Sequence, residues 1–153
     1  YVEEAGYKYN MMDIQASLGI HQLNKIEDNW LKRERIWHYY NDNFTNLPIT
    51  LPAKPEDNTR HGYHLYTVLI DEKISGLSRD QFIKKMNSDK IGTGIHYVSI
   101  PDHPYYQKQF GWKSNHYPNA MKIGRQTVSL PFSPDLTDHE IDRVVKTVKK
   151  VLN

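Results

Sequence analysis

The stretch DIQASLGIHQLNKIEDNWLKRERIWHYYNDNFTN, residues 13–46, decides how this chain is organised. Its apolar side chains recur mostly at steps of three, four or seven, which places them on one stripe of an α-helix: Ile14, Leu18, Leu23, Ile26, Trp30, Trp37, Tyr40 and Phe44. Asp13 is a good N-cap, and Pro48 ends the pattern. An unbroken helix here would measure roughly 50 Å at 1.5 Å per residue. Because that exceeds the usual globular length, we expect it to connect two bodies, with Gly19 or residues 27–29 as a bend.

Three short runs after Pro48 are apolar or aromatic and are predicted to be β-strands: 61–71, 91–98 and 126–130. Capping-box patterns predict helices that begin after Ser78 and Thr137, the first of them ending near Asp89. Pro118 suits the first turn of a short helix through about residue 123, whereas residues 101–112 are expected to be irregular. The order predicts an α/β fold (a small α+β domain), in which a long N-terminal linking helix leads to a short sheet packed by helices.

The composition bounds the class of protein. The chain has 153 residues, of which 38% are hydrophobic, and its mean hydropathy is -0.75. These low values fit a very polar small domain or a piece of a larger subunit, and the start at Tyr1 without an initiator Met favours the piece. The net charge of +2 predicts neither a nucleic-acid partner nor an anionic membrane partner, and no apolar stretch reaches the ~18 residues of a membrane span.

Cysteine is absent, which excludes disulfides, thiolate zinc sites and cysteine nucleophiles and is compatible with a cytoplasmic location. His61 and His64 look like a metal-binding pair, but residues three apart on a strand point to opposite faces. We therefore expect no metal site. The charged run 32–35 is interpreted as a solvated helix face, and Gly92-x-Gly94 lacks the third glycine of a phosphate-binding loop.

Packing does not explain two other stretches. Residues 6–16 form a polar, tyrosine-rich turn before the long helix, and Lys8 with the Asn10 amide could hold a phosphate, although a plain helix entry stays open. Residues 92–97 lead into 101–106, a loop of His, Tyr and Pro whose flat rings with polar tips suit sugars and nucleobases. A core histidine with a satisfied hydrogen bond is the open alternative there.

Four ordered blocks make the whole chain resemble the DegT/StrS family of nucleotide-sugar aminotransferases. Gly6-Tyr7-Lys8-Tyr9-Asn10-Met11 and then Asp13-Ile14-Gln15-Ala16 resemble the family's signature turn and helix start. His64-Leu65-Tyr66 resembles its His-Leu-Tyr strand. The blocks Ile91–Tyr97 and Ser129-Leu130-Pro131 with Leu136-Thr137 resemble the two later family blocks.

The resemblance implies the C-terminal domain of a type I aminotransferase fold that depends on pyridoxal 5'-phosphate (PLP). Such enzymes move an amino group, usually from glutamate, to a nucleotide-linked keto sugar. Their Schiff-base lysine lies upstream of the signature turn, so no residue of this chain is expected to be catalytic and the chain alone is expected to be inactive. The implied organisation is an active-site and dimer-interface loop over 1–12, an interdomain helix over 13–47, and a small α/β domain over 48–153.

Site residues follow from the resemblance by position. The turn resembles a loop that reaches into the neighbouring subunit of a homodimer, where Asn10 is expected to contact the cofactor phosphate and Lys8 to add charge. His96 and Tyr97 match residues near the sugar nucleotide, and His103 matches a second frequent histidine.

The sequence departs from the family pattern at two positions, and two other functions remain possible. Pro101 replaces another frequent histidine, and Ser99 stands where proline is frequent. Two alternatives remain: a sugar dehydratase or non-catalytic regulator on the same fold, or a stand-alone dimerisation or binding module.

Overall fold

The computed structural model describes residues 6, 7 and 9–153. The predicted long helix is present as two helices, α1 (Asp13–Leu23) and α2 (Ile26–Phe44). The break lies at Asn24 and Lys25 rather than at Gly19 or 27–29. There the Lys25 N–H donates to the carbonyl of Gln22 at 3.1 Å, a tighter turn than the α-helical one.

The start of α1 also differs from the prediction. Met12, not Asp13, is the N-cap residue, and Asp13 is the first residue of the helix. The side chain of Gln15 closes the end, because its Oε1 accepts a hydrogen bond from the Met12 N–H at 3.0 Å. Asp13 is still favourable there, since a negative charge in the first turn complements the helix dipole.

The sheet has two antiparallel strands, β1 (Tyr66–Leu69) and β2 (Thr127–Leu130), with Tyr66 opposite Leu130 and Leu69 opposite Thr127. The predicted strand 61–71 is shorter because Tyr63 has a positive φ of 43°, which ends the extended run before β1. The predicted strand 91–98 is reduced to a single bridge, from Gly94 to Ser129.

Capping boxes begin two helices as the sequence predicted. In α4 (Arg79–Ser88), Ser78 and Gln81 bond to each other's backbone N–H, and in α7 (Asp138–Leu152), Thr137 and Glu140 do the same. The short helix α3 (Glu72–Ser75) was not predicted. It starts because Asp71 accepts a hydrogen bond from the Lys73 N–H at 3.0 Å.

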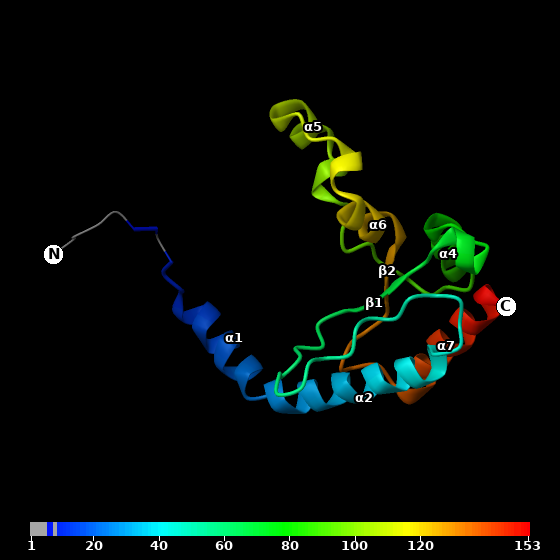
Figure 1. The fold of residues 1–153 in the computed structure, drawn as a ribbon. Helices are drawn as coiled ribbons and strands as arrows, with labels where there is room; N and C mark the ends of the chain where they lie inside the picture. The colour runs from blue at the N-terminus through cyan, green and yellow to red at the C-terminus, as the bar shows by residue number, and fades with distance from the viewer. Residues whose placement is uncertain (1–5, 8) are drawn as a thin grey trace.

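The core lies where α2, α4 and α7 meet the sheet (Figure 1). Its largest fully buried side chains come from each of these elements: Ile36, Tyr40, Phe44, Tyr66, Val68, Ile70, Phe82, Met86, Val128, Val144 and Val148. Burial raises the pKa of Tyr40, whose hydroxyl donates to the carbonyl of Pro131 at 2.9 Å. The predicted α+β class, with helices packed on a short sheet, is confirmed.

Residues 100–126 form a separate helical arm that projects from the core (Figure 1). It consists of the 3-10 helices η1 (Ile100–Asp102) and η2 (Ser114–His116) and of the α-helices α5 (Pro104–Phe110) and α6 (Pro118–Gln126). The prediction of an irregular 101–112 was wrong, because prolines in the first turns of η1 and α5 favour the start of helices there. No helix of the described residues is long and apolar enough to cross a membrane.

Candidate functional site

The described residues of the N-terminal segment before α1, which are 6, 7 and 9–12, are exposed to solvent. Tyr7 and Tyr9 are each 86% exposed, and Asn10 is exposed as well. The Asn10 amide, which carries two donors and one acceptor, makes no hydrogen bond within the described part of the chain. Lys8, the other predicted phosphate-binding residue, lies outside the described residues.

The segment continues into α1, which buries none of its side chains. The large apolar residues of this helix and of its approach are more than half exposed: Met11, Met12, Ile14, Leu18, Ile20 and Leu23. Exposed large apolar side chains gathered on one short helix are typical of a surface that contacts another body. In Figure 1, α1 leads away from the rest of the molecule.

A second cluster lies where residues 92–98 meet β2. Gly94 and Ser129 exchange both backbone hydrogen bonds, at 3.0 and 2.8 Å. This bridge places the ring of His96 against the Ser129 side chain, with 2.8 Å between Nδ1 and Oγ. Tyr97 is 74% exposed and meets the His96 ring edge-on, at 4.9 Å between centroids. The two predicted substrate-binding residues thus lie side by side, one anchored and one open to solvent.

His103, the third predicted substrate-binding residue, lies at the N-cap of α5 and is exposed. Its ring is 6.4 Å from that of Tyr106, at the edge of an aromatic cluster on the arm. Within the described residues no contact joins His103 to His96, and none joins Asn10 to either histidine. The structure therefore groups His96 with Tyr97 and leaves Asn10 and His103 apart.

The model of the DegT/DnrJ/EryC1/StrS aminotransferase family matches residues 1–149. The chain belongs to this family. The predicted resemblance is therefore confirmed.

Relatives of this family member span bacteria and archaea. It is 40% identical over 152 residues to the spore coat polysaccharide biosynthesis protein SpsC of Bacillus subtilis, and 41% identical over 150 residues to MJ1066 of Methanocaldococcus jannaschii. These alignments cover 99% and 98% of the chain. They cover 39% of each relative, so the chain spans about two-fifths of the length of the curated relatives it matches.

Solved structures support the same fold. The structure of S. venezuelae DesV in complex with a ketimine intermediate matches this chain with a TM-score of 0.86 at 26% identity. That match covers 97% of this chain and 38% of DesV. Spr1654 of Streptococcus pneumoniae, solved in an apo-form, a PMP-form and a PLP-form, has TM-scores of 0.85, 0.85 and 0.84 at 28% identity. Those matches cover 99 to 100% of this chain and 37 to 40% of Spr1654.

Ser99, which stands where proline is frequent in the family, has a structural role in this chain. The Ser99 hydroxyl donates to the carbonyl of Ala120 in α6. Gly124 allows this approach, because a Cβ there would lie 2.7 Å from the Ser99 nitrogen and would overlap its hydroxyl. Ser99 thus fastens the loop after Tyr97 to the helical arm.

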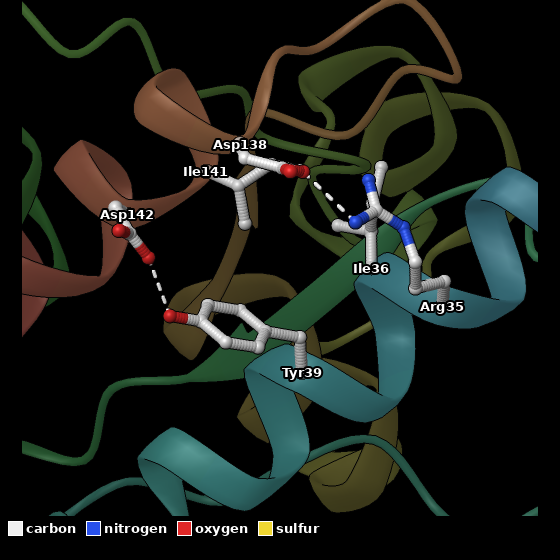
Figure 2. A pocket seen from close by; sticks show the side chains of 6 residues that line it. All are labelled: Arg35, Ile36, Tyr39, Asp138, Ile141 and Asp142. Atoms are coloured by element: carbon white, nitrogen blue, oxygen red, sulfur yellow. Dashed lines mark hydrogen bonds and ion pairs between the residues drawn. The ribbon is translucent and has the colours of Figure 1, made fainter.

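A pocket of about 260 Å³ lies between α2 and α7 of this family member. Figure 2 shows the side chains that line it. Arg35 pairs with Asp138 at 2.8 Å, and the Tyr39 hydroxyl donates to Asp142, which raises the pKa of Tyr39. Both pairs are solvent-exposed, so each contributes little to stability. The sequence did not predict this pocket, because its residues come from two helices far apart in the chain: Tyr39 and Asp142 are separated by 103 residues.

The two histidines that looked like a metal pair are separated in the structure. His61 packs on Trp37 with 4.9 Å between ring centroids, and its Nδ1 accepts the Tyr63 N–H at 3.1 Å. His64 is exposed. No group of three or more metal-ligating side chains occurs among residues 6, 7 and 9–153.

Proposed function

We propose that this chain is the C-terminal part of a PLP-dependent transaminase that moves an amino group, with glutamate as the usual donor, to a keto sugar attached to a nucleotide. Membership of the aminotransferase family supports the reaction class. The PLP-form and PMP-form of Spr1654 support the cofactor. The name of the B. subtilis relative supports a role in the synthesis of polysaccharide precursors.

The exposed N-terminal segment is the observation that carries the proposal. Its Asn10 amide makes no hydrogen bond to the residues that the structure describes, and hydrogen bonds from an amide suit a phosphate oxygen. The segment sits on α1, a helix with no buried side chain, so the surrounding apolar surface is available to a neighbouring subunit. We infer that Asn10, with added charge from Lys8, holds the phosphate of PLP in the partner subunit of a homodimer.

These residues fit the cofactor without supplying its chemistry. Bound PLP serves as an electron sink during amino transfer. The exposed Asn10 would orient that group by its phosphate, and the apolar side chains of α1 would exclude water once they are covered. We assign no catalytic residue to this chain.

His96, Tyr97 and His103 are proposed to contact the sugar nucleotide. The anchored ring of His96 offers one ring nitrogen at a fixed position, and the exposed ring of Tyr97 offers a flat face for a sugar or a base. His103 at the start of α5 would contact a more distant part of the same ligand, since no contact joins it to His96.

The test is transamination by the complete protein that contains this chain. With PLP and glutamate, it is expected to convert nucleotide-linked keto sugars into amino sugars, detected by mass spectrometry. A panel of UDP-, GDP- and dTDP-linked sugars would identify the nucleotide. Cofactor binding without any glutamate-dependent amino sugar, or release of water from the sugar in place of amination, would overturn the proposal.

A further inference from the structure

Ser129 is a buried polar residue for which neither the fold nor the proposed function gives a role. It lies in β2, is 4% exposed, and its backbone pairs with Gly94 on the edge of the sheet. Its hydroxyl has one hydrogen-bond partner among the described residues, the Nδ1 atom of His96 at 2.8 Å. The sequence pattern gave it only as part of a Ser-Leu-Pro block.

The direction of this hydrogen bond follows from burial. If His96 donated through Nδ1, the Ser129 hydroxyl hydrogen would be buried with no acceptor in the described part of the chain. A buried donor without an acceptor costs ~1–3 kcal/mol. We therefore assign the hydroxyl as the donor and Nδ1 as the acceptor, which places the ring hydrogen of the neutral histidine on Nε2.

Gly94 makes the space that the His96 ring occupies. A Cβ built on Gly94 would lie 2.7 Å from the ring Cε1, closer than side-chain atoms approach one another, and 3.2 Å from Nδ1, which is a tight contact. Any other residue at this position would therefore require the ring to shift from its place beside Ser129. Gly94 and Ser129, joined by their backbone bridge, thus form a slot for the ring.

The Nε2 atom is left available. It has no hydrogen-bond partner among the described residues. It is also absent from the small set of fully buried side-chain atoms without a partner, so a ligand can reach it. A fixed Nε2–H fits an acceptor such as a phosphate oxygen, and hydrogen bonds to charged groups are the stronger ones.

We propose that Ser129 is a positioning residue, which together with Gly94 holds His96 so that Nε2–H donates to an anionic oxygen of the bound ligand. The identity of that ligand, the diphosphate of a sugar nucleotide, rests on the proposed function. The tautomer of the His96 ring does not rest on it, because Ser129 of this chain sets that tautomer. In this assignment His96 binds and does not act as a base.

The first experiment measures the ring hydrogen directly. The complete protein, labelled with ¹⁵N-histidine, is recorded by NMR at about pH 8.5, where histidine is usually neutral, and His96 is assigned with His96→Gln. We expect Nε2 at the shift of a protonated nitrogen and Nδ1 at that of an unprotonated one. Ser129→Ala should shift the ring toward a mixture of the two tautomers, and Ser129→Thr should restore a single one. A wild-type ring protonated at Nδ1, or a ring unchanged by Ser129→Ala, would overturn the inference.

The second experiment asks whether the slot matters for binding. Ser129→Ala and Gly94→Ala should each raise the KM for the sugar nucleotide about tenfold, the lower end for a hydrogen bond to a charged group. The kcat should change less than twofold, because the contact is the same in ground and transition states. Thr127→Ala is the matched control, since Thr127 is equally buried on the same face of β2 and does not contact His96. An equal KM rise in Thr127→Ala, or none in either slot variant, would count against a positioning role.

The two proposals fail in different ways. A complete protein that neither binds UDP, GDP or dTDP nor aminates a sugar contradicts the proposed function, whatever the tautomer. A ring with its hydrogen on Nδ1 contradicts the role of Ser129 even in an active transaminase.

Discussion

Two consecutive helices of this chain carry large apolar side chains and bury them very differently. In the second half of α2 these side chains are covered by the chain's own core, and Phe44 is fully buried. In α1, Leu18 is 62% exposed and no side chain is buried. The break at Asn24 and Lys25 separates them.

The difference shows what an apolar stripe can and cannot tell. The stripe indicates that a helix face is to be covered, but not by which body. For α2 that body is α7 and the sheet of this chain. For α1 we propose the rest of the complete protein and its partner subunit. Under that proposal, α2 serves folding, whereas the region of α1 would serve assembly and cofactor binding.

The largest expected effect is in α2. Phe44→Ala should lower the free energy of unfolding by about 3–5 kcal/mol, because it removes a fully buried ring that stacks on Tyr40 at 5.4 Å. Urea denaturation of the chain followed by circular dichroism measures this. A loss below about 1 kcal/mol would mean that α2 is not part of the core and would remove the contrast with α1.

Asn10→Ala tests the functional side of the comparison. In the complete protein it should weaken PLP retention by about 1–3 kcal/mol, as a hydrogen bond to a charged group is lost. The unfolding of the chain should stay unchanged, since Asn10 makes no hydrogen bond in its described part. Asn46→Ala, another exposed amide, is the control for cofactor titration. Equal affinity in wild type and Asn10→Ala would remove Asn10 from the site.

Thr137→Ala should destabilise the chain by about 1 kcal/mol through loss of the α7 cap. The equivalent change at the start of α1, Gln15→Ala, removes the closing hydrogen bond of a helix that buries nothing, so the unfolding of the chain should change less. Thermal unfolding of the two variants compares them. The opposite order would show that α1 is coupled to the core.

The pH dependence of stability should reflect α7 as well. The backbone N–H and the hydroxyl of Thr137 donate to the Glu140 carboxylate and hold the pKa of that carboxyl below its usual value. A carboxyl with a lowered pKa stabilises the fold above its unfolded pKa, and this contribution is lost as the pH falls below about 4.5 and through the folded pKa. Glu140→Gln should therefore lose less stability than wild type between about pH 5 and pH 3, measured by urea denaturation at each pH. Parallel profiles would contradict the prediction.

The smallest effect is expected in α1. Leu18→Ala should change the unfolding of the chain by less than about 0.5 kcal/mol, because the side chain is exposed there. In the complete protein the same variant should cost about 1–3 kcal/mol, as a leucine buried by another body would. Equal effects in chain and complete protein would show that nothing covers this helix.

Local signals in the sequence predicted most of the helices and their starts. The Ser78 and Thr137 capping boxes act within four residues of the chain, so they could be predicted correctly. The strands were predicted too long, since Tyr63 adopts a positive φ that propensity does not reveal. The family motif gave His96, whereas its partner Ser129 lies 33 residues further along and only the sheet brings them together.

The sequence by itself determined the family, the capped helices and the apolar, helical character of residues 13–46, because these depend on the identity and spacing of nearby residues. Only the tertiary structure decided that α2 is buried and α1 is open, and that Gly94 and Ser129 form a slot for His96. Burial and side-chain contact arise between segments distant in the chain, so no local pattern specifies them.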